Sequence, residues 1–287
     1  MANLRDIKRR ITSVTNTQKI TRAMKMVAAA KLRRAQEAIV QSRPYALQMR
    51  DMVNNLAARA ELDGHPLLRD NSATTNKVSF LVITSDRGLC GGFNSSIVNA
   101  AMDNIRNDLA DKDIQLTVVG RKGIELLKRR TDSIAHTYTN VFDGDIYHEA
   151  SNIVDDVSEL FSKGDTEAVY CLFNEFKSAI NQKVTLERLL PFEPAPTEGR
   201  FAHTDYEYEP SQTHVFDALL SRHMKIQMHR ILNESAASEH GARMTAMESA
   251  TTNAGEMIDR LTLQYNRARQ NAITTELIEV ISGAEAL

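Results

Sequence analysis

Proline is missing from long segments at both ends of the chain. The last 77 residues, Ser211 to Leu287, contain no proline, and neither proline nor glycine occurs before Pro44. Because proline interrupts helices, its absence permits one very long helix at each end. Nowhere do about 18 apolar residues follow one another, so the sequence predicts no transmembrane helix.

Cysteine is also scarce. Cys90 and Cys171 each lie in or beside an apolar, strand-like run. We expect both to be buried, reduced thiols, and two cysteines exclude a disulfide framework. The eight histidines form neither HxxxH nor HExxH, and no CxxC pair exists, so no metal site is predicted.

A complete nucleotide-binding motif is missing as well. The segment Ser85 to Asn94 (SDRGLCGGFN) carries three glycines after a strand-like run, where a phosphate could bind. It fits neither GxGxxG nor GxxxxGK[ST], and no lysine follows. We interpret it as a tight strand-to-helix turn with Asn94 as a possible N-cap, and we predict no active site and no cofactor.

What the C-terminal segment does contain is a regular heptad pattern, in which gaps of three and four residues alternate. Eight of the ten seam positions are apolar, aromatic or alanine, which is typical of a coiled-coil helix. Such a helix would extend for roughly 100 Å, too long for one compact domain to bury. The seam positions are Met244, Met247, Thr251, Ala254, Ile258, Leu261, Tyr265, Ala268, Ala272 and Thr275.

The N-terminal segment supplies a partner for this helix. We expect a helix from Asn3 or Leu4 to about Ala58, with Pro44 as a place where it could bend. Its first seam residues fall at heptad spacing, and a second set repeats the spacing in a shifted frame. The first set is Leu4, Ile7, Ile11 and Val14; the second is Ile20, Met24, Val27 and Lys31.

Between the two helices, residues 59–76 contain helix breakers and predict a linker. After it, apolar runs alternate with helical patterns, which predicts a mostly parallel sheet covered on both faces. The expected fold class is thus α/β plus a long coiled coil: antiparallel terminal helices with an inserted Rossmann-like domain. The predicted divisions are 1–58, 59–76, 77–210 and 211–287. The expected strands are 77–84, 114–119, 134–139, 168–174 and 183–190, and the expected helices are 94–109, 121–130 and 147–162.

Charge is distributed unevenly, although the net charge is only −2. From Arg5 to Arg34 there are ten Lys or Arg residues and one acid, whereas no Lys or Arg follows Arg269. The basic helix could bind nucleic acid or an acidic protein surface. Because basic and seam positions are interleaved, the pattern favours a protein partner. A coiled-coil scaffold and a nucleic-acid-binding adaptor both remain open on these grounds.

The last helical turns have a wider apolar surface than one partner helix can cover. The four apolar side chains there spread over roughly 160° of the helix circumference at about 100° per residue. They are Leu277, Ile278, Val280 and Ile281. This end of the helix therefore needs a collar that contacts it from several sides.

Four segments of the chain resemble the gamma subunit of the rotary (F-type) ATP synthase, in its bacterial form. They occur in the family's order and spacing and span the whole chain; Gly241 and Thr245 depart slightly from the commoner residues. The segments are Ile11 to Ala30 (ITSVTNTQKITRAMKMVAAA), Thr84 to Asn94 (TSDRGLCGGFN), Glu239 to Asn253 (EHGARMTAMESATTN) and Tyr265 to Gly283 (YNRARQNAITTELIEVISG).

The resemblance implies a central-stalk rotor subunit that carries out no bond chemistry itself. Its expected partners are the alpha and beta subunits of the catalytic hexamer, the epsilon subunit and the membrane c ring. One copy is expected per complex, with no nucleic acid bound. The expected location is peripheral, on the cytoplasmic face of the bacterial plasma (inner) membrane.

The resemblance also implies roles for individual residues. Contact with the beta subunits and torque transfer are expected of Met24, Lys25, Arg33, Arg34, Arg243, Arg269, Gln270, Thr274 and Glu276. An apolar bearing tip is expected at Leu277 to Leu287, including Leu277, Ile278, Val280 and Ile281. Contact with the c ring and epsilon is expected of Tyr206, Tyr208 and Glu209.

Overall fold

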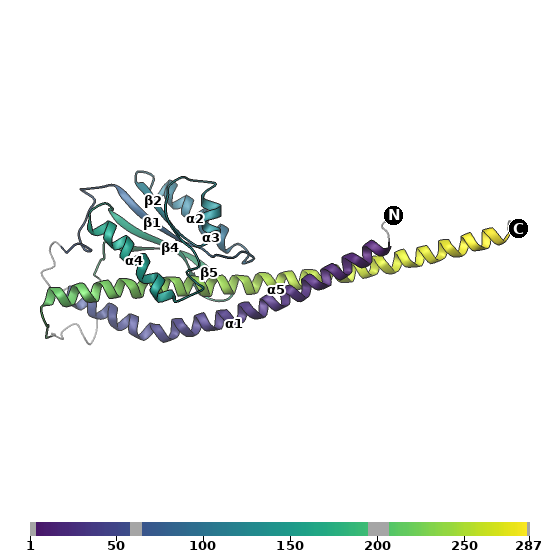
Figure 1. Ribbon diagram of the computed structural model, residues 1–287, viewed down its shortest axis with the longest axis horizontal. Helices are drawn as coiled ribbons and strands as arrows, with labels where there is room; N and C mark the ends of the chain where they lie inside the picture. Colours follow the sequence, from purple (N-terminus) through teal and green to yellow (C-terminus); the bar gives the residue numbers. More distant parts are fainter. Residues whose placement is uncertain (1–3, 58–64, 195–206, 286–287) are drawn as a thin grey trace. The chain divides into compact units, whose positions relative to one another are not determined.

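The structure is a computed structural model that describes residues 4–57, 65–194 and 207–285. The chain divides into two compact units. One, which we call the paired-helix unit, comprises Met1–Ala28 and Arg243–Leu287; the other, the α/β unit, comprises Ala29–Ala242. Two long helices contribute to both: α1 spans Leu4–Ala57 and continues through Pro44, and α5 spans Gln212–Glu285 (Figure 1). Both predicted terminal helices are confirmed.

The α/β unit contains a five-stranded sheet in the order β3-β2-β1-β4-β5. Strands β1 to β4 run parallel, and β5 pairs antiparallel with β4 at one edge. The predicted, mostly parallel sheet with a returning edge strand is therefore confirmed. The strands are β1 (Lys77–Ile83), β2 (Asp113–Val119), β3 (Ile134–Tyr138), β4 (Ala168–Phe176) and β5 (Gln182–Leu190).

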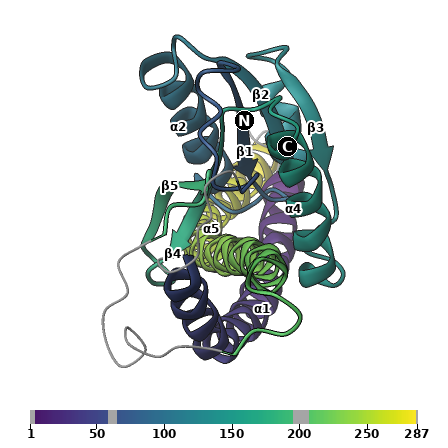
Figure 2. The same cartoon turned by 90° about the vertical axis from the view of Figure 1, so that its left-hand side faces the viewer.

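Helices cover both faces of this sheet. Helices α2 (Phe93–Asn107) and α3 (Arg121–Leu127) pack on one face, and α4 (Ile146–Ser162) packs on the other. Figure 2 shows α2 and α4 on opposite sides of the strands. Successive residues of β1 point alternately into the two cores, as the two-residue period of a strand requires. Phe80 and Val82 face α2, whereas Leu81 and Ile83 face α4.

Helix α5 completes the core on the α4 side of the sheet. Met224, Met228, Ile231 and Leu232 are buried there together with residues of β1, β4 and α4. The predicted 77–210 domain thus shares its core with the C-terminal helix, which the sequence pattern did not indicate. A further apolar cluster joins Val53 and its neighbours on α1 to the start of α5. The four-part division of the chain remains a prediction.

The glycine-containing turn after β1 is closed by its own side chains. The Asn94 amide Nδ2 donates to Ser85 Oγ at 2.8 Å, and Asn94 Oδ1 accepts from the Ser85 backbone N–H at 3.0 Å. The N-cap of α2 is Gly92, so the prediction of Asn94 as N-cap is wrong. Asn94 lies two residues further on, in the first turn of α2, and uses its amide to link the helix to the end of β1. Cys90 and Cys171 are both buried free thiols, as expected.

Candidate functional site

In the paired-helix unit, α1 and α5 contact one another in antiparallel orientation. The Gln18 side chain donates to the Thr251 carbonyl at 3.4 Å, and the hydroxyls of Thr21 and Thr251 lie 2.8 Å apart. One turn further along α1, Lys25 Nζ is 2.7 Å from Glu248 Oε1. Residue numbers therefore rise along α1 in the direction in which they fall along α5. Polar pairs occupy this part of the contact between the two helices.

The predicted seam of α5 is confirmed along most of its length. Nine of the ten positions, from Met244 to Ala272, are buried or half-buried, whereas nearly every residue between Glu248 and Ala272 outside the seam is exposed. Thr275 is exposed, so the prediction is wrong at its last position. The seam ends there because α1 begins at Leu4 among the described residues and offers no further turns to pair with.

The predicted frame shift in α1 is wrong. Ile20 and Val27 are 61% and 57% exposed, so they lie outside the seam. The first frame continues instead through Gln18, Thr21 and Lys25 to the buried Ala28. Polar side chains can occupy these positions because each meets a polar partner on α5, which offsets the cost of removing it from water.

This correction leaves an apolar stripe on the outer surface of α1. Ile20, Ala23, Met24 and Val27 are spaced i, i+3, i+4 and i+7, which places them on one side of the helix. Three of the four are exposed and Met24 is half-buried. We call these four residues the outer stripe; a stripe of this kind, bordered by Lys19 and Arg22, is typical of a surface that contacts another protein.

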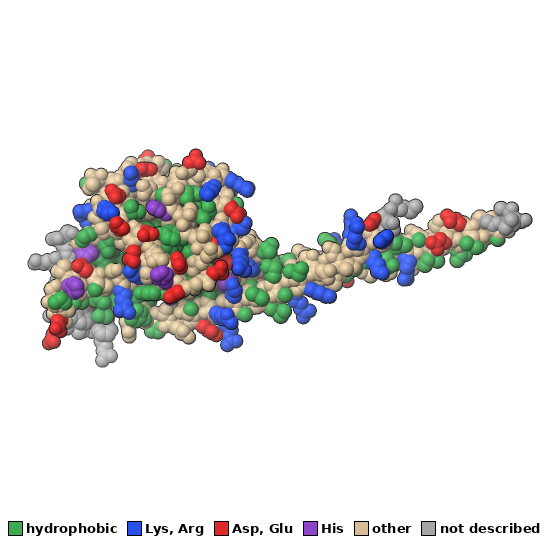
Figure 3. Space-filling model, in the orientation of Figure 1, with side chains coloured by type: hydrophobic (Ala, Val, Ile, Leu, Met, Phe, Trp, Pro, Cys, Tyr) green, Lys and Arg blue, Asp and Glu red, His purple; other side chains and the backbone are tan. Residues whose placement is uncertain are grey.

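The end of α5 has no cover from the described part of the chain. All described side chains from Ile273 to Ala284 are exposed, including Leu277 (56%), Ile278 (57%), Val280 (72%) and Ile281 (50%). Figure 3 shows hydrophobic and acidic side chains on this end, beyond the last basic ones. We call Ile273 to Ala284 the uncovered end.

The polar residues expected to contact beta subunits are accessible just before and within this end. Arg269, Gln270, Thr274 and Glu276 are all exposed, and the Thr274 hydroxyl donates to the Gln270 carbonyl at 2.9 Å. Gln270, Thr274 and Ile278 follow at intervals of four, so polar and apolar groups share one side of the helix. Arg243, near the start of the seam, is half-buried.

Other expected contact residues belong to the α/β unit. Arg33 and Arg34 are exposed on α1, where Arg33 pairs with Glu37 at 2.9 Å. Tyr208 is half-buried and packs against the cluster around Val53, whereas Glu209 is exposed. Tyr206 lies outside the described residues. The structure thus presents Glu209 for contact and uses the Tyr208 ring for packing.

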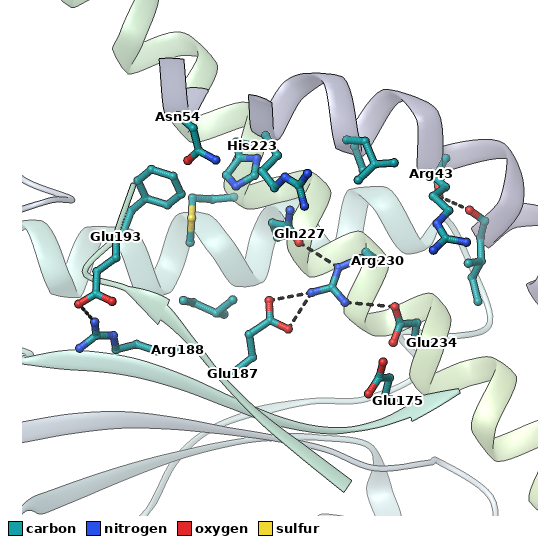
Figure 4. Close-up of a pocket in the computed structure, with 18 of the residues that line it drawn as sticks. Arg43, Asn54, Glu175, Glu187, Arg188, Glu193, His223, Gln227, Arg230 and Glu234 are labelled. Atoms are coloured by element: carbon teal, nitrogen blue, oxygen red, sulfur yellow. Dashed lines mark hydrogen bonds and ion pairs between the residues drawn. The ribbon is translucent and has the colours of Figure 1, made fainter. Parts of the chain in front are cut away.

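A cavity of about 750 Å³ lies within the α/β unit, between α1, α5 and the β4–β5 edge of the sheet (Figure 4). At its centre the Arg230 guanidinium contacts both Glu187 oxygens at 2.7 Å and Glu234 at 3.1 Å. His223 lines the same cavity and is almost fully buried. Burial, reinforced by the cations Arg50 and Arg230, lowers the pKa of His223 to about 4.

The match to known proteins runs along the whole chain. The family described as ATP synthase matches residues 3–287. The ATP synthase gamma chain of Geobacter metallireducens is 50% identical over 100% of this chain and 99% of the relative. That of an Anaeromyxobacter species is 49% identical over the full length of both. The chain belongs to the ATP synthase gamma chain family.

Solved structures agree with this membership. The central stalk and c-ring structure of the Tetrahymena thermophila mitochondrial ATP synthase matches with a TM-score of 0.62 and 26% identity. That match covers 80% of this chain and 99% of the other. A chain of the Euglena gracilis mitochondrial ATP synthase shares the fold, with a TM-score of 0.70 and 18% identity over 99% and 94% of the two chains.

Two features of this gamma chain family member were not predicted from sequence. Three residues of the outer stripe, Ile20, Met24 and Val27, were assigned to the seam because their spacing also fits a heptad pattern. The group around Arg230 gave no signal, since Arg230 and Glu187 are 43 residues apart and form no motif.

None of the described helices has a stretch both long and apolar enough to cross a membrane.

Proposed function

We propose that this chain is the single-copy rotor subunit in the central stalk of a proton-translocating ATP synthase. The observation that carries the proposal is the full-length match to ATP synthase gamma chains. The uncovered end of α5 supports it, because the apolar side chains there need a surrounding protein surface. In this proposal the hexamer of alpha and beta subunits surrounds that end.

The rotor acts by presenting different contacts to each beta subunit in turn. The helix pair has one outer stripe and one set of exposed polar residues, Arg269, Gln270, Thr274 and Glu276. It therefore cannot contact three equivalent subunits identically at the same moment. A contact that differs between two conformations of a beta subunit shifts the balance between them by the difference in contact free energy. Turning the pair moves that bias from one nucleotide site to the next.

Specific residues supply these contacts in the proposal. The outer stripe around Met24, with Arg33 and Arg34, contacts the beta subunits, and Arg243 contributes from α5. Lys25 pairs with Glu248 in the seam and contributes to the same contact through the exposed part of its side chain. Arg269, Gln270, Thr274 and Glu276 form polar contacts with the beta subunits that transmit torque, and the apolar residues that follow act as a bearing. The exposed positions of Met24's neighbours and of the four polar residues support this assignment.

The remaining partners contact the α/β unit. Contact with the c ring and the epsilon subunit is assigned in this proposal to Glu209, together with Tyr206 and Tyr208. In this proposal the chain is peripheral, on the cytoplasmic face of a bacterial plasma membrane. The chain itself carries out no catalysis in this proposal. In support, the glycine-containing turn forms hydrogen bonds within itself instead of displaying the pattern of a phosphate loop.

A single-molecule rotation assay tests the proposal directly. Both natural cysteines are buried, so a Thr213→Cys variant offers one accessible thiol at an exposed position for attaching a gold rod. With the hexamer immobilised, ATP should drive stepwise rotation of the rod in one direction. A rod attached to a beta subunit is the control and should stay fixed. Steady ATP hydrolysis by complexes whose Thr213→Cys rod never rotates would exclude a rotor role.

A further inference from the structure

The ion-pair group around Arg230 joins α5 to the edge of the sheet. Arg230 Nη2 donates to both oxygens of Glu187 on β5, and Nη1 donates to Glu234 on α5. Its Nε donates to Gln227 Oε1 at 2.9 Å, and the guanidinium lies 5.9 Å from the centre of the Phe173 ring on β4. One arginine thus contacts two strands and its own helix (Figure 4).

The group is partly withdrawn from water. The side chains of Arg230, Glu187 and Glu234 are 30%, 34% and 15% exposed. Burial tends to lower the pKa of Arg230, but the attraction of Glu187 and Glu234 outweighs it and the pKa is raised. Burial raises the pKa of Glu234 despite the opposing effect of Arg230. Arg230 therefore offsets two carboxylates that would otherwise repel one another at the sheet edge.

Further contacts along the same side of α5 continue toward the tip of the β4–β5 hairpin. Ser238, two turns after Arg230, donates its hydroxyl to the Asn174 carbonyl at 2.9 Å. At Gly241 a Cβ atom would lie 3.2 Å from the backbone of Ala179. These directional contacts add to the packing of the apolar core formed by Met228 and Ile231, because a hydrogen bond or ion pair also depends on the angle between its two partners.

We propose that Arg230, held between Glu187 and Glu234, is a positioning residue that fixes the rotation of α5 against the sheet. We call these three residues the Arg230 clamp. This inference rests on the proposed rotor function. Torque that enters through the sheet of the α/β unit must reach α5 without rotation of the helix about its own axis. The three guanidinium nitrogens of Arg230 each bond to a different side chain, Glu187, Glu234 or Gln227. Because the guanidinium is planar, these three directions are fixed together and resist such turning, whereas a lysine has one nitrogen on a flexible stem.

Three variants of the full chain, each assembled into the complex, test the clamp. Arg230→Lys keeps the charge but loses the planar set of three donor nitrogens that bond to Glu187, Glu234 and Gln227. Arg230→Met combined with Glu187→Leu and Glu234→Gln replaces the clamp by uncharged side chains, a change that often leaves stability intact. Lys225→Gln is the matched control, because Lys225 also pairs α5 with the α/β unit, through Asp155 at 2.8 Å on α4.

The measurements are thermal unfolding of each isolated chain and, in inverted membrane vesicles, protons pumped per ATP hydrolysed. We expect Arg230→Lys to remain folded and to lower the pumping ratio about twofold. The uncharged triple variant should lower the ratio further at an unfolding temperature near that of the wild type. Lys225→Gln should pump like the wild type.

The outcomes separate the clamp from the rotor function on which it rests. A wild-type pumping ratio in the folded Arg230→Lys variant overturns the clamp, and so does an equal loss in Lys225→Gln. If the triple variant does not fold, the Arg230→Lys ratio alone decides. Should the wild-type chain itself fail to support pumping in assembled vesicles, the rotor function is refuted and not the clamp alone.

Discussion

Two methionines on α5 allow a matched test of the seam. Met247 is 5% exposed in the seam, whereas Met257, ten residues later on the same helix, is 51% exposed. Burying a methionine side chain stabilises a protein by about 1.5–3 kcal/mol relative to leaving it in water. Replacing Met247 by alanine removes most of this stabilisation, and a two-helix seam can close partly over the gap.

We therefore expect Met247→Ala to destabilise the paired-helix unit by about 2 kcal/mol, and Met257→Ala to change its stability by less than about 0.5 kcal/mol. Hydrogen exchange is the suitable measurement, because it reports the opening of this unit separately from the α/β unit. Amide protection between residues 243 and 272 should fall in the first variant only. Equal amide protection in the two variants would refute the pairing of α1 with α5. The assignment of the outer stripe and of the polar pairs in the seam depends on that pairing.

Two further predictions concern pH and the uncovered end. The pKa of His223 falls from 6.5 to about 4 on folding. As the pH is lowered, the unfolded chain therefore binds a proton at this histidine at a higher pH than the folded chain does. The associated stability, about 3 kcal/mol, is present above pH 6.5 and is lost as the pH falls toward 4. Urea titrations across this range should show the loss in the wild type and a shallower slope in His223→Gln; parallel slopes would contradict the assignment to His223. Truncation after Glu276 should leave the unfolding temperature of the isolated chain unchanged, since the removed side chains are exposed where described. In vesicles it should lower ATP-driven proton pumping per assembled complex, and unchanged assembly with unchanged pumping would remove the bearing role.

The sequence by itself determined which segments are helices and strands. The long helices follow from the missing proline and from the heptad pattern, both of which act within a few residues along the chain. The parallel sheet follows from apolar strands that alternate with helical segments, such as β1 (Lys77–Ile83) followed by α2 (Phe93–Asn107). The four segments that resemble gamma subunits identified the family, which the full-length match then confirmed.

Tertiary structure decided which side of each helix is covered. Spacing alone continues the first frame of the seam to Thr21, whereas apolarity favoured Ile20 in a shifted frame. The contact between Thr21 and Thr251, 230 residues apart, decided for the polar residue. Periodicity shows that a helix has an apolar side, but only the partner helix determines which turns are paired and which are left for another protein.

The same reason explains the Arg230 clamp and the role of α5 in the sheet's core. Met228 and Arg230 are two residues apart on α5, yet one lies in the apolar core and the other forms ion pairs at the sheet edge. Nothing local distinguishes these positions from other positions of an amphipathic helix. The contacts that distinguish the two positions are made with strands β4 and β5, which are distant in the chain; Glu187, for example, is 43 residues before Arg230. These contacts form only when the helix packs against the sheet.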